Sequence, residues 1–233
     1  LCIRDSLDAP QFARLTTSQV RGLTTTQIER FSTTDIAEMA VTQIGALTAD
    51  QLEGFSPADI SALSVTQVAV LTAGQIAGLT PVQLRGLSTT DMGEFSATQI
   101  GALTSTQVGA LSLVAVAALN ETQFTGLTAT QVRGFTAEQL ASFGPQGLAR
   151  LSGQQLGALT TTQIGQLPAA AIESLNTTQI GQIMPSQISG FTSGQIAAFT
   201  PGQLTQFSRA QLNRLTAAQL DAMTPSQLEA IGL

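Results

Sequence analysis

Apolar residues recur along the chain with a strict period of eight. Counted from Leu7, the sequence divides into 28 octads that end at Ala230 without an insertion or deletion. The first residue of every octad is Leu, Phe, Met or Ile, and the sixth is Ile, Val, Leu, Met or Phe. A fixed short period is typical of a repeat architecture, in which each unit packs mainly on its neighbours. We therefore expect a non-repeat segment at 1–6, a solenoid of octads at 7–230 and a truncated next octad at 231–233.

Polar residues occupy two further fixed positions of the octad. The second residue is Ser, Thr, Asp or Asn in 24 of the 28 octads, and the fifth is Gln in 22. This is the spacing of a capping box, in which a hydroxyl accepts from the N3 amide and the N3 side chain reaches back to the N-cap amide. In LTTTQIER (23–30), Thr24 is the expected N-cap and Gln27 its partner. The pattern predicts that each octad begins a new helix of about five or six residues.

Proline gives an independent check on this register. Proline is favoured at N1, where its missing N–H leaves no hydrogen bond unmade. The third octad position, which is N1 in this register, holds six of the eight prolines: Pro57, Pro81, Pro145, Pro185, Pro201 and Pro225. Pro10 falls at N2, and only Pro168 takes the cap position itself.

The fold class follows from how the apolar positions align. In one continuous helix, eight residues advance about 800°, so the apolar stripe rotates around the helix and no face stays apolar. In octads of separate helices, the sixth residue and the next first residue lie three apart and share a face, as for Ile28 and Phe31. We predict an all-α solenoid of very short helices around a thin apolar core. The alternative is a β-solenoid, although positions one and six would then point to opposite faces of a strand.

The column of glutamines admits more than one role. The amide oxygen is expected to cap its own helix. The functional alternatives are a ladder of side-chain amides between layers, or an exposed stripe for recognition. Capping and a ladder are compatible, because the oxygen can cap while the nitrogen donates to the adjacent coil. Asp35, Asp59 and Asp91 replace the glutamine in three octads.

Composition excludes several classes of function. Charged residues make up 10 % of the chain, and 15 acidic residues against nine basic ones give a net charge of −6. That balance argues against nucleic-acid binding, which needs a basic surface. The longest apolar run, 113–119, is far short of the roughly 20 residues that span a membrane. Cys2 is the single cysteine, so no internal disulfide is expected; it is a free thiol or a crosslink to another chain.

Candidate catalytic and metal-binding residues are few. Histidine is absent and all nine basic residues are Arg, so the usual bases that activate a serine or cysteine nucleophile are missing. Carboxylate pairs occur within single octads at Asp35/Glu38, Asp50/Glu53 and Asp91/Glu94, where capping and solvation explain them better than a glycosidase dyad. We predict no enzymatic activity, no catalytic, cofactor-binding or metal-binding residues, and no cofactor.

Three octads depart from the pattern. LSLVAVAA (111–118) places Leu113 and Val114 at positions that are usually Thr, Ala or Pro. It has Ala115 at position five, and FGPQGLAR (143–150) and LPAAAIES (167–174) also lack the amide there. Sequence drift explains all three. The alternative for 111–118 is a local apolar patch on which another chain packs.

The octads LTTTQIGQL (159–167) and FSATQIGAL (95–103) resemble the Thr/Gln octapeptide repeat tracts of very large bacterial surface and secreted proteins, some of them adhesins. The resemblance covers nearly the whole chain and implies an extracellular or bacterial cell-surface location and an architectural role; it carries no site residues. The sequence starts at Leu1 without an initiator Met or signal segment, so we expect a fragment or processed product of a longer protein.

The expected function is therefore structural: a stalk, spacer or filament-forming scaffold that associates end to end or with neighbouring repeats of a longer chain. The alternative is a binding module whose regular Thr and Gln columns recognise a glycan, ice or another surface.

Overall fold

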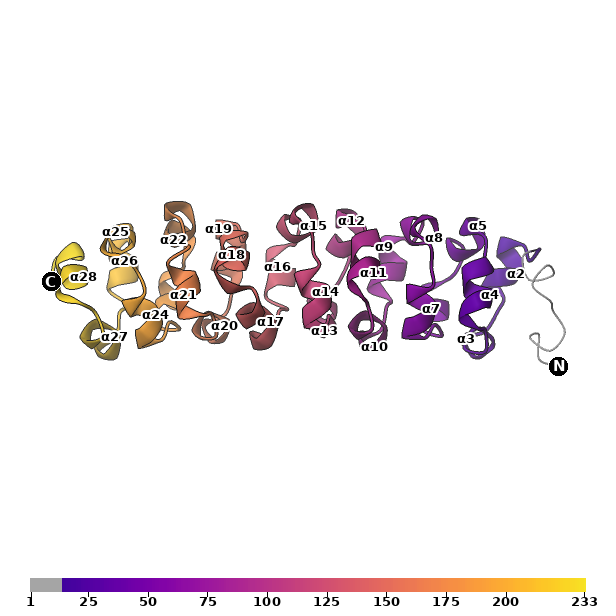
Figure 1. Cartoon of the computed structure of the whole chain (residues 1–233), viewed down its shortest axis with the longest axis horizontal. Coiled ribbons are helices and arrows are strands. Elements are labelled where there is room, and N and C mark those ends of the chain that lie inside the picture. Colours follow the sequence, from indigo (N-terminus) through magenta and orange to yellow (C-terminus); the bar gives the residue numbers. More distant parts are fainter. Residues whose placement is uncertain (1–13) are drawn as a thin grey trace. The chain divides into compact units, whose positions relative to one another are not determined.

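The computed structural model describes residues 14–233, and every regular element in that range is a short helix (Figure 1). These residues fall into two compact units, one ending at Gly126 and the other spanning Leu127–Leu233. The all-α solenoid is confirmed, and the β-solenoid alternative is wrong for the described part of the chain. The predicted non-repeat segment 1–6, Cys2 and Pro10 lie outside the described residues.

The helices follow one another at intervals of one octad. In the first unit they are α2 (Thr17–Arg21), α3 (Thr25–Ile28), α4 (Thr33–Glu38), α5 (Val41–Ile44), α6 (Ala49–Leu52), α7 (Pro57–Ser61), α8 (Val65–Ala69), α9 (Ala73–Ala77), α10 (Pro81–Arg85), α11 (Thr89–Glu94), α12 (Ala97–Gly101), α13 (Ser105–Ala110), α14 (Leu113–Ala117) and α15 (Glu121–Thr125). In the second they are α16 (Ala129–Val132), α17 (Ala137–Ser142), α18 (Gly144–Ala149), α19 (Gly153–Ala158), α20 (Thr161–Gly165), α21 (Ala169–Ile172), α22 (Thr177–Gln182), α23 (Pro185–Ile188), α24 (Ser193–Ala197), α25 (Pro201–Leu204), α26 (Arg209–Leu212), α27 (Ala217–Asp221) and α28 (Pro225–Ala230).

Capping boxes start most of these helices, as the sequence predicts. The backbone N–H of Thr24 donates to Oε1 of Gln27 over 2.8 Å, and the N–H of Gln27 donates to Oγ1 of Thr24 over 3.2 Å. The same reciprocal pair recurs along both units. Four described helices begin after residues whose side chains cannot cap: Ala40, Phe143, Pro168 and Met184.

The prolines confirm the register with one exception. Pro57, Pro81, Pro185, Pro201 and Pro225 are the first residues of their helices, and Pro168 is the N-cap of α21. The N1 placement of Pro145 is wrong, because α18 begins one residue earlier at Gly144. Position two of this octad is Gly144 itself, which offers no capping hydroxyl and adopts a φ of 58° that other residues avoid.

Each unit coils with three helices per turn. Helices three apart in the chain pack on one another, as α10 does on α13 in the first unit and α19 on α22 in the second. Three octads of eight residues therefore make a turn of 24, and each unit has three columns of stacked helices around a shared core. The first and sixth octad positions face inward, and Ile28, Leu52 and Ile76 are almost completely buried. An apolar space of about 10 Å³ remains between Ile76, Leu84 and Met92 in the core of the first unit, about the smallest volume that could hold one water molecule.

The glutamines join consecutive turns of the coil. Oε1 of Gln83 accepts from the N–H of Thr80 over 2.7 Å, and Nε2 donates to the carbonyls of Leu52 and Phe55 over 2.6 and 2.7 Å. These two carbonyls lie 31 and 28 residues earlier in the chain. The same spacing recurs at Gln51, Gln67, Gln75, Gln99, Gln107 and Gln123, and at Gln179, Gln187, Gln195, Gln203, Gln211 and Gln219.

Capping and the amide ladder therefore coexist in single side chains. Gln83 is 2 % exposed, and most glutamines of the ladder are similarly buried. The third alternative, a regular glutamine stripe exposed for recognition, is wrong for these buried residues. Each glutamine of the ladder accepts from the N–H at the start of its own helix and donates to two carbonyls of the turn before it.

Replacing Gln83 by Glu separates the two roles. The carboxylate keeps the oxygen that caps Thr80 but loses the N–H donors, so two buried carbonyls face an anion instead of an amide. We expect Gln83→Glu to lower the free energy of unfolding at pH 7 by about 2–4 kcal/mol. The loss should shrink as the pH falls and the carboxyl group becomes a donor again. Urea unfolding followed by circular dichroism between pH 3 and 8 measures both effects.

Gln19→Glu is the matched control. Gln19 forms the same capping box with Thr16, but its side chain is exposed, and its hydrogen bonds to described residues stay within its own octad. Gln19→Glu should lower the free energy of unfolding only slightly at any pH. Equal losses at Gln19 and Gln83 would show that the ladder contributes nothing to stability.

Candidate functional site

The carboxylate pairs of the sequence lie where capping and solvent explain them. Oδ2 of Asp35 accepts from the N–H and the hydroxyl of Ser32, which makes it the N3 member of a capping box, and Glu38 is exposed. Asp50 and Glu53 are both exposed around α6. The part of the chain that the structure describes holds no group of three or more metal-ligating side chains. No helix among these residues is long and apolar enough to cross a membrane.

Asp91 shows how the ladder accommodates a shorter, acidic residue. It is 7 % exposed, and its Oδ2 accepts from the N–H of Ser88 over 2.7 Å. The same oxygen accepts from the hydroxyl of Ser61 over 2.8 Å. Ser61 lies 30 residues earlier, on the previous turn, so the two turns remain joined by a hydrogen bond of the opposite direction, in which the earlier turn donates and Asp91 accepts. The Asp91 carboxylate is thus a structural acceptor.

Glu94 is the second member of that pair and is half-buried at the end of α11. Desolvation by burial raises the pKa of its carboxyl group, and the negative charge of Asp91 raises it further. Both causes disfavour the ionised form. The two negative charges repel each other, but both carboxylates lie on one short helix. They do not face each other across a cleft as the two acids of a glycosidase do.

The three irregular octads have different outcomes. In 111–118, Leu113 and Val114 are 38 % and 57 % exposed, so the predicted apolar patch is on the surface. In 167–174, Ala171 takes the place of the amide and is completely buried. In 143–150, Gly147 takes it, and the helix starts early after Phe143. All three octads lack the position-five amide, since Ala115 stands at that position in 111–118.

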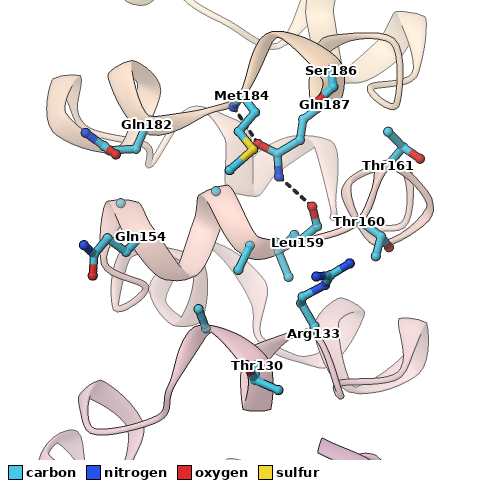
Figure 2. A pocket seen from close by; sticks show the side chains of 14 residues that line it. Thr130, Arg133, Gln154, Leu159, Thr160, Thr161, Gln182, Met184, Ser186 and Gln187 are labelled. Carbon is cyan, nitrogen blue, oxygen red and sulfur yellow. Dashed lines mark hydrogen bonds between the residues drawn. The ribbon is translucent and has the colours of Figure 1, made fainter.

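A hollow lies on the surface of the second unit. It is an open groove with a volume of about 750 Å³. Residues of α16, α19, α20, α22 and α23 and of the turns beside them line it, and Figure 2 shows them: Ala129, Thr130, Arg133, Gly153, Gln154, Gly157, Ala158, Leu159, Thr160, Thr161, Gln182, Met184, Ser186 and Gln187. Its lining is mainly hydroxyl, amide and small side chains, and Arg133 is its one charged residue.

Close packing of two helices shapes one side of this groove. A Cβ atom on Gly153 would lie 2.5 Å from Cγ of Gln182, and one on Gly157 would lie 2.8 Å from the carbonyl oxygen of Gln182. Glycine at both positions therefore lets α19 approach α22 more closely than an alanine would allow. Because these residues hold the helices together, they form a fixed wall.

Met184 is the unusual residue of the groove. It stands at an N-cap, where Ser or Thr would supply a hydroxyl, and 53 % of it is exposed. Gln187 still caps the Met184 N–H over 2.7 Å and donates to the carbonyl of Leu159 over 2.6 Å, as Figure 2 shows. The methionine thus weakens a helix start and puts an apolar thioether beside polar groups.

The sequence analysis did not find this groove. Its residues come from octads up to about 60 positions apart, and only the three-helix turn places them together. The one available signal was Met184, which breaks the Ser/Thr column at position two.

Removing the charge of Glu94 tests the electrostatics of α11. A raised pKa means that the ionised form is disfavoured in the folded state, so the penalty is present above the folded pKa and disappears below the unfolded one. We expect Glu94→Gln to raise the melting temperature by roughly 1–2 °C at pH 7 and to have no effect at pH 3. Glu38→Gln, at the same octad position but exposed, is the control. A gain that persists at pH 3 would contradict the electrostatic explanation.

Sequence comparison places part of the chain beside a known repeat. The ALTTAQ repeat family matches residues 44–81 and 81–113. No curated protein matches the sequence. The matched segments confirm a tandem repeat over 44–113, and the same octad continues on both sides of them. The chain is similar to the ALTTAQ repeat over this part, which supports its description as a repeat-based structural protein.

Proposed function

We propose that this chain is an architectural segment of an extracellular or bacterial cell-surface scaffold, serving as a stalk or spacer. The observation that carries the proposal is the use of the polar side chains. In octad after octad the hydroxyl at position two caps a helix and the glutamine at position five joins two turns, as at Thr80 and Gln83. Because these side chains are used to join helices and turns, they extend the coil and are not free to act on a substrate.

The residue inventory supports a non-enzymatic role. The chain has no histidine, and its carboxylates at Asp35, Asp59 and Asp91 act as capping acceptors. Catalysis needs an acid, base or nucleophile gathered in a cleft. The groove of the second unit offers only the guanidinium of Arg133 as a charged group.

The surface location is supported by the resemblance of the octads to repeat tracts of very large bacterial surface and secreted proteins. The same ladder suggests the partner. A turn of the coil presents carbonyls at a spacing that suits the glutamines of the next turn, so further octads are the natural neighbours, within a longer chain or from another copy.

Deleting one whole turn tests the spacer. Removing residues 191–214, three octads, joins Gly190 to Leu215 in phase and lets Gln219 meet equivalent carbonyls one turn earlier. We expect a folded helical protein whose second unit is shorter by about 9–10 Å, the spacing of one packed helix layer. Small-angle scattering and circular dichroism measure the two properties.

Removing residues 191–210 is the control, since this deletion is two and a half octads and breaks the register. It should melt at a much lower temperature. If both deletions unfold the second unit, the octads are not interchangeable spacers. Antibody labelling of source cells only after lysis, and not on intact cells, would contradict the surface location.

The groove favours a second candidate function, recognition of an acidic saccharide. Hydroxyl and amide side chains suit sugar hydroxyls, and the guanidinium of Arg133 suits a carboxylate. This differs from recognition through regular Thr and Gln columns, because the glutamine column is buried.

A titration with uronic-acid and neutral oligosaccharides tests this candidate. Arg133→Ala should weaken binding of the acidic sugars by about tenfold, the effect of one lost charge-assisted contact. Arg85→Ala is matched, because Arg85 has the same octad position on α10 but lies outside the groove. The absence of binding by the wild-type chain would remove the candidate.

A further inference from the structure

Four of the five exposed large apolar residues in the described part of the first unit lie on one column of helices, and Val82 lies on another. The helices α2, α5, α8, α11 and α14 stack on one another in that order. Their first residues are Thr17, Val41, Val65, Thr89 and Leu113, and three of these five are large and apolar. Val41, Val65 and Leu113 are 37 %, 58 % and 38 % exposed, and Val114 beside Leu113 is 57 % exposed. We call these four apolar residues the apolar stripe.

The other two columns of the unit do not share this feature. At the same octad position their helices carry, from α3 to α15, Thr25, Thr33, Ala49, Pro57, Ala73, Pro81, Ala97, Ser105 and Glu121. The stripe therefore recurs with the period of the coil, every third octad, although nothing in the octad pattern requires it.

Folding gives no reason for this placement. The first residue of each helix points away from the core, and Val has a lower helix propensity than the Ala found in other columns. Exposed apolar side chains arranged contiguously on a polar body are typical of a contact surface. The stripe is contiguous except at Thr89, whose side chain is also uncharged.

The four helices of the apolar stripe carry little charge, and the exposed Arg21 of α2, the next helix of this column, donates from Nε to the carbonyl oxygen of Ala46. The octads 39–46, 63–70 and 111–118 contain no charged residue. The octad of α11 holds Asp91, which is buried, and Glu94, which is half-buried at a corner; Glu38 lies at the corner before α5. The whole chain carries a net charge of −6, so two copies repel each other over most of their surfaces. The apolar stripe is a face on which two copies can meet with little repulsion.

We propose that a second copy of this chain packs side by side against the apolar stripe. A second copy offers the same apolar residues at the same spacing, because its coil has the same period. A two-fold arrangement brings each stripe onto the other and closes the contact at a dimer. Four stacked helices give a face roughly 30–40 Å long. A strip of that length and one helix width buries roughly 600–800 Å² in total, below the size of standard specific interfaces, so the dimer is weak and transient.

Sedimentation equilibrium of the full chain under reducing conditions tests the proposal. The wild type should show a monomer–dimer equilibrium in the micromolar range. The double variant Val65→Thr with Leu113→Thr installs the residue that α11 already carries at this position, so it should fold normally. Loss of two buried apolar contacts should raise the dissociation constant by about tenfold or more.

Val82→Thr is the matched control. Val82 is 61 % exposed, more than any residue of the apolar stripe, but it lies on α10 in a different column. It should leave the dissociation constant unchanged. Circular dichroism melts of all variants confirm that folding is intact.

Three outcomes would overturn the proposal. The first is a wild-type chain that stays monomeric across the concentration range, and the second is equal weakening by Val82→Thr and by the double variant. The third is open-ended growth that the stripe variants do not change, which would place the contact at the ends of the coil. None of these outcomes affects the spacer function, which needs only a single folded chain.

Discussion

The whole architecture depends on one side chain that uses both ends of its amide. The oxygen of a position-five glutamine caps the helix that contains it, and the nitrogen donates to two carbonyls of the preceding turn, as Gln75 does to Ile44 and Leu47. A helix of four to six residues is unstable alone, because nucleation costs more than so few hydrogen bonds return. The glutamine lowers that cost at the start of the helix and fixes the helix to its neighbours, so local and tertiary structure form together.

Burial makes these bonds valuable. An amide left without partners in an apolar layer would cost several times what a solvated hydrogen bond contributes. In the described part of the chain, no buried side-chain nitrogen or oxygen lacks a partner. Asp91 illustrates the constraint. Its carboxylate can only accept hydrogen bonds, and the hydroxyl of Ser61 on the turn before donates to it. The apolar side chains at octad positions one and six exclude water from these hydrogen bonds, and the glutamine ladder fixes the register between successive turns.

The outward positions of the octad are free of these constraints, and the individual features of the chain arise there. The apolar stripe lies on the first residues of α5, α8 and α14, which are octad position three, and on Val114 beside them. Residues around α19 and α22 form the groove with Arg133 and Met184. Both features repeat or assemble over whole turns of the coil. The distinctive surfaces of such a chain therefore depend on residues 24 positions apart, which is three octads, whereas the fold depends on residues that recur every eight positions.

Much of the fold could be predicted because its determinants are local. The box of Thr24 and Gln27, the inward pair Ile28 and Phe31, and the first-residue prolines all depend on residues within one octad. Pro145 was misplaced because Gly144 changed the backbone before it, an effect that a side-chain pattern does not record. The groove was missed because its walls come from several turns, and a single octad contains none of its geometry.

The sequence by itself determined that each octad starts a helix, which residues face the core and that glutamine caps the helix. These are consequences of hydrogen bonds and periodicity between near neighbours in the chain. Only the tertiary structure decided that three helices complete a turn, that the glutamine nitrogen reaches carbonyls 28 and 31 residues earlier, and that Val41, Val65 and Leu113 share one column. The physical reason is that the angle between successive helices comes from packing around the shared core, and that angle sets which octads become neighbours.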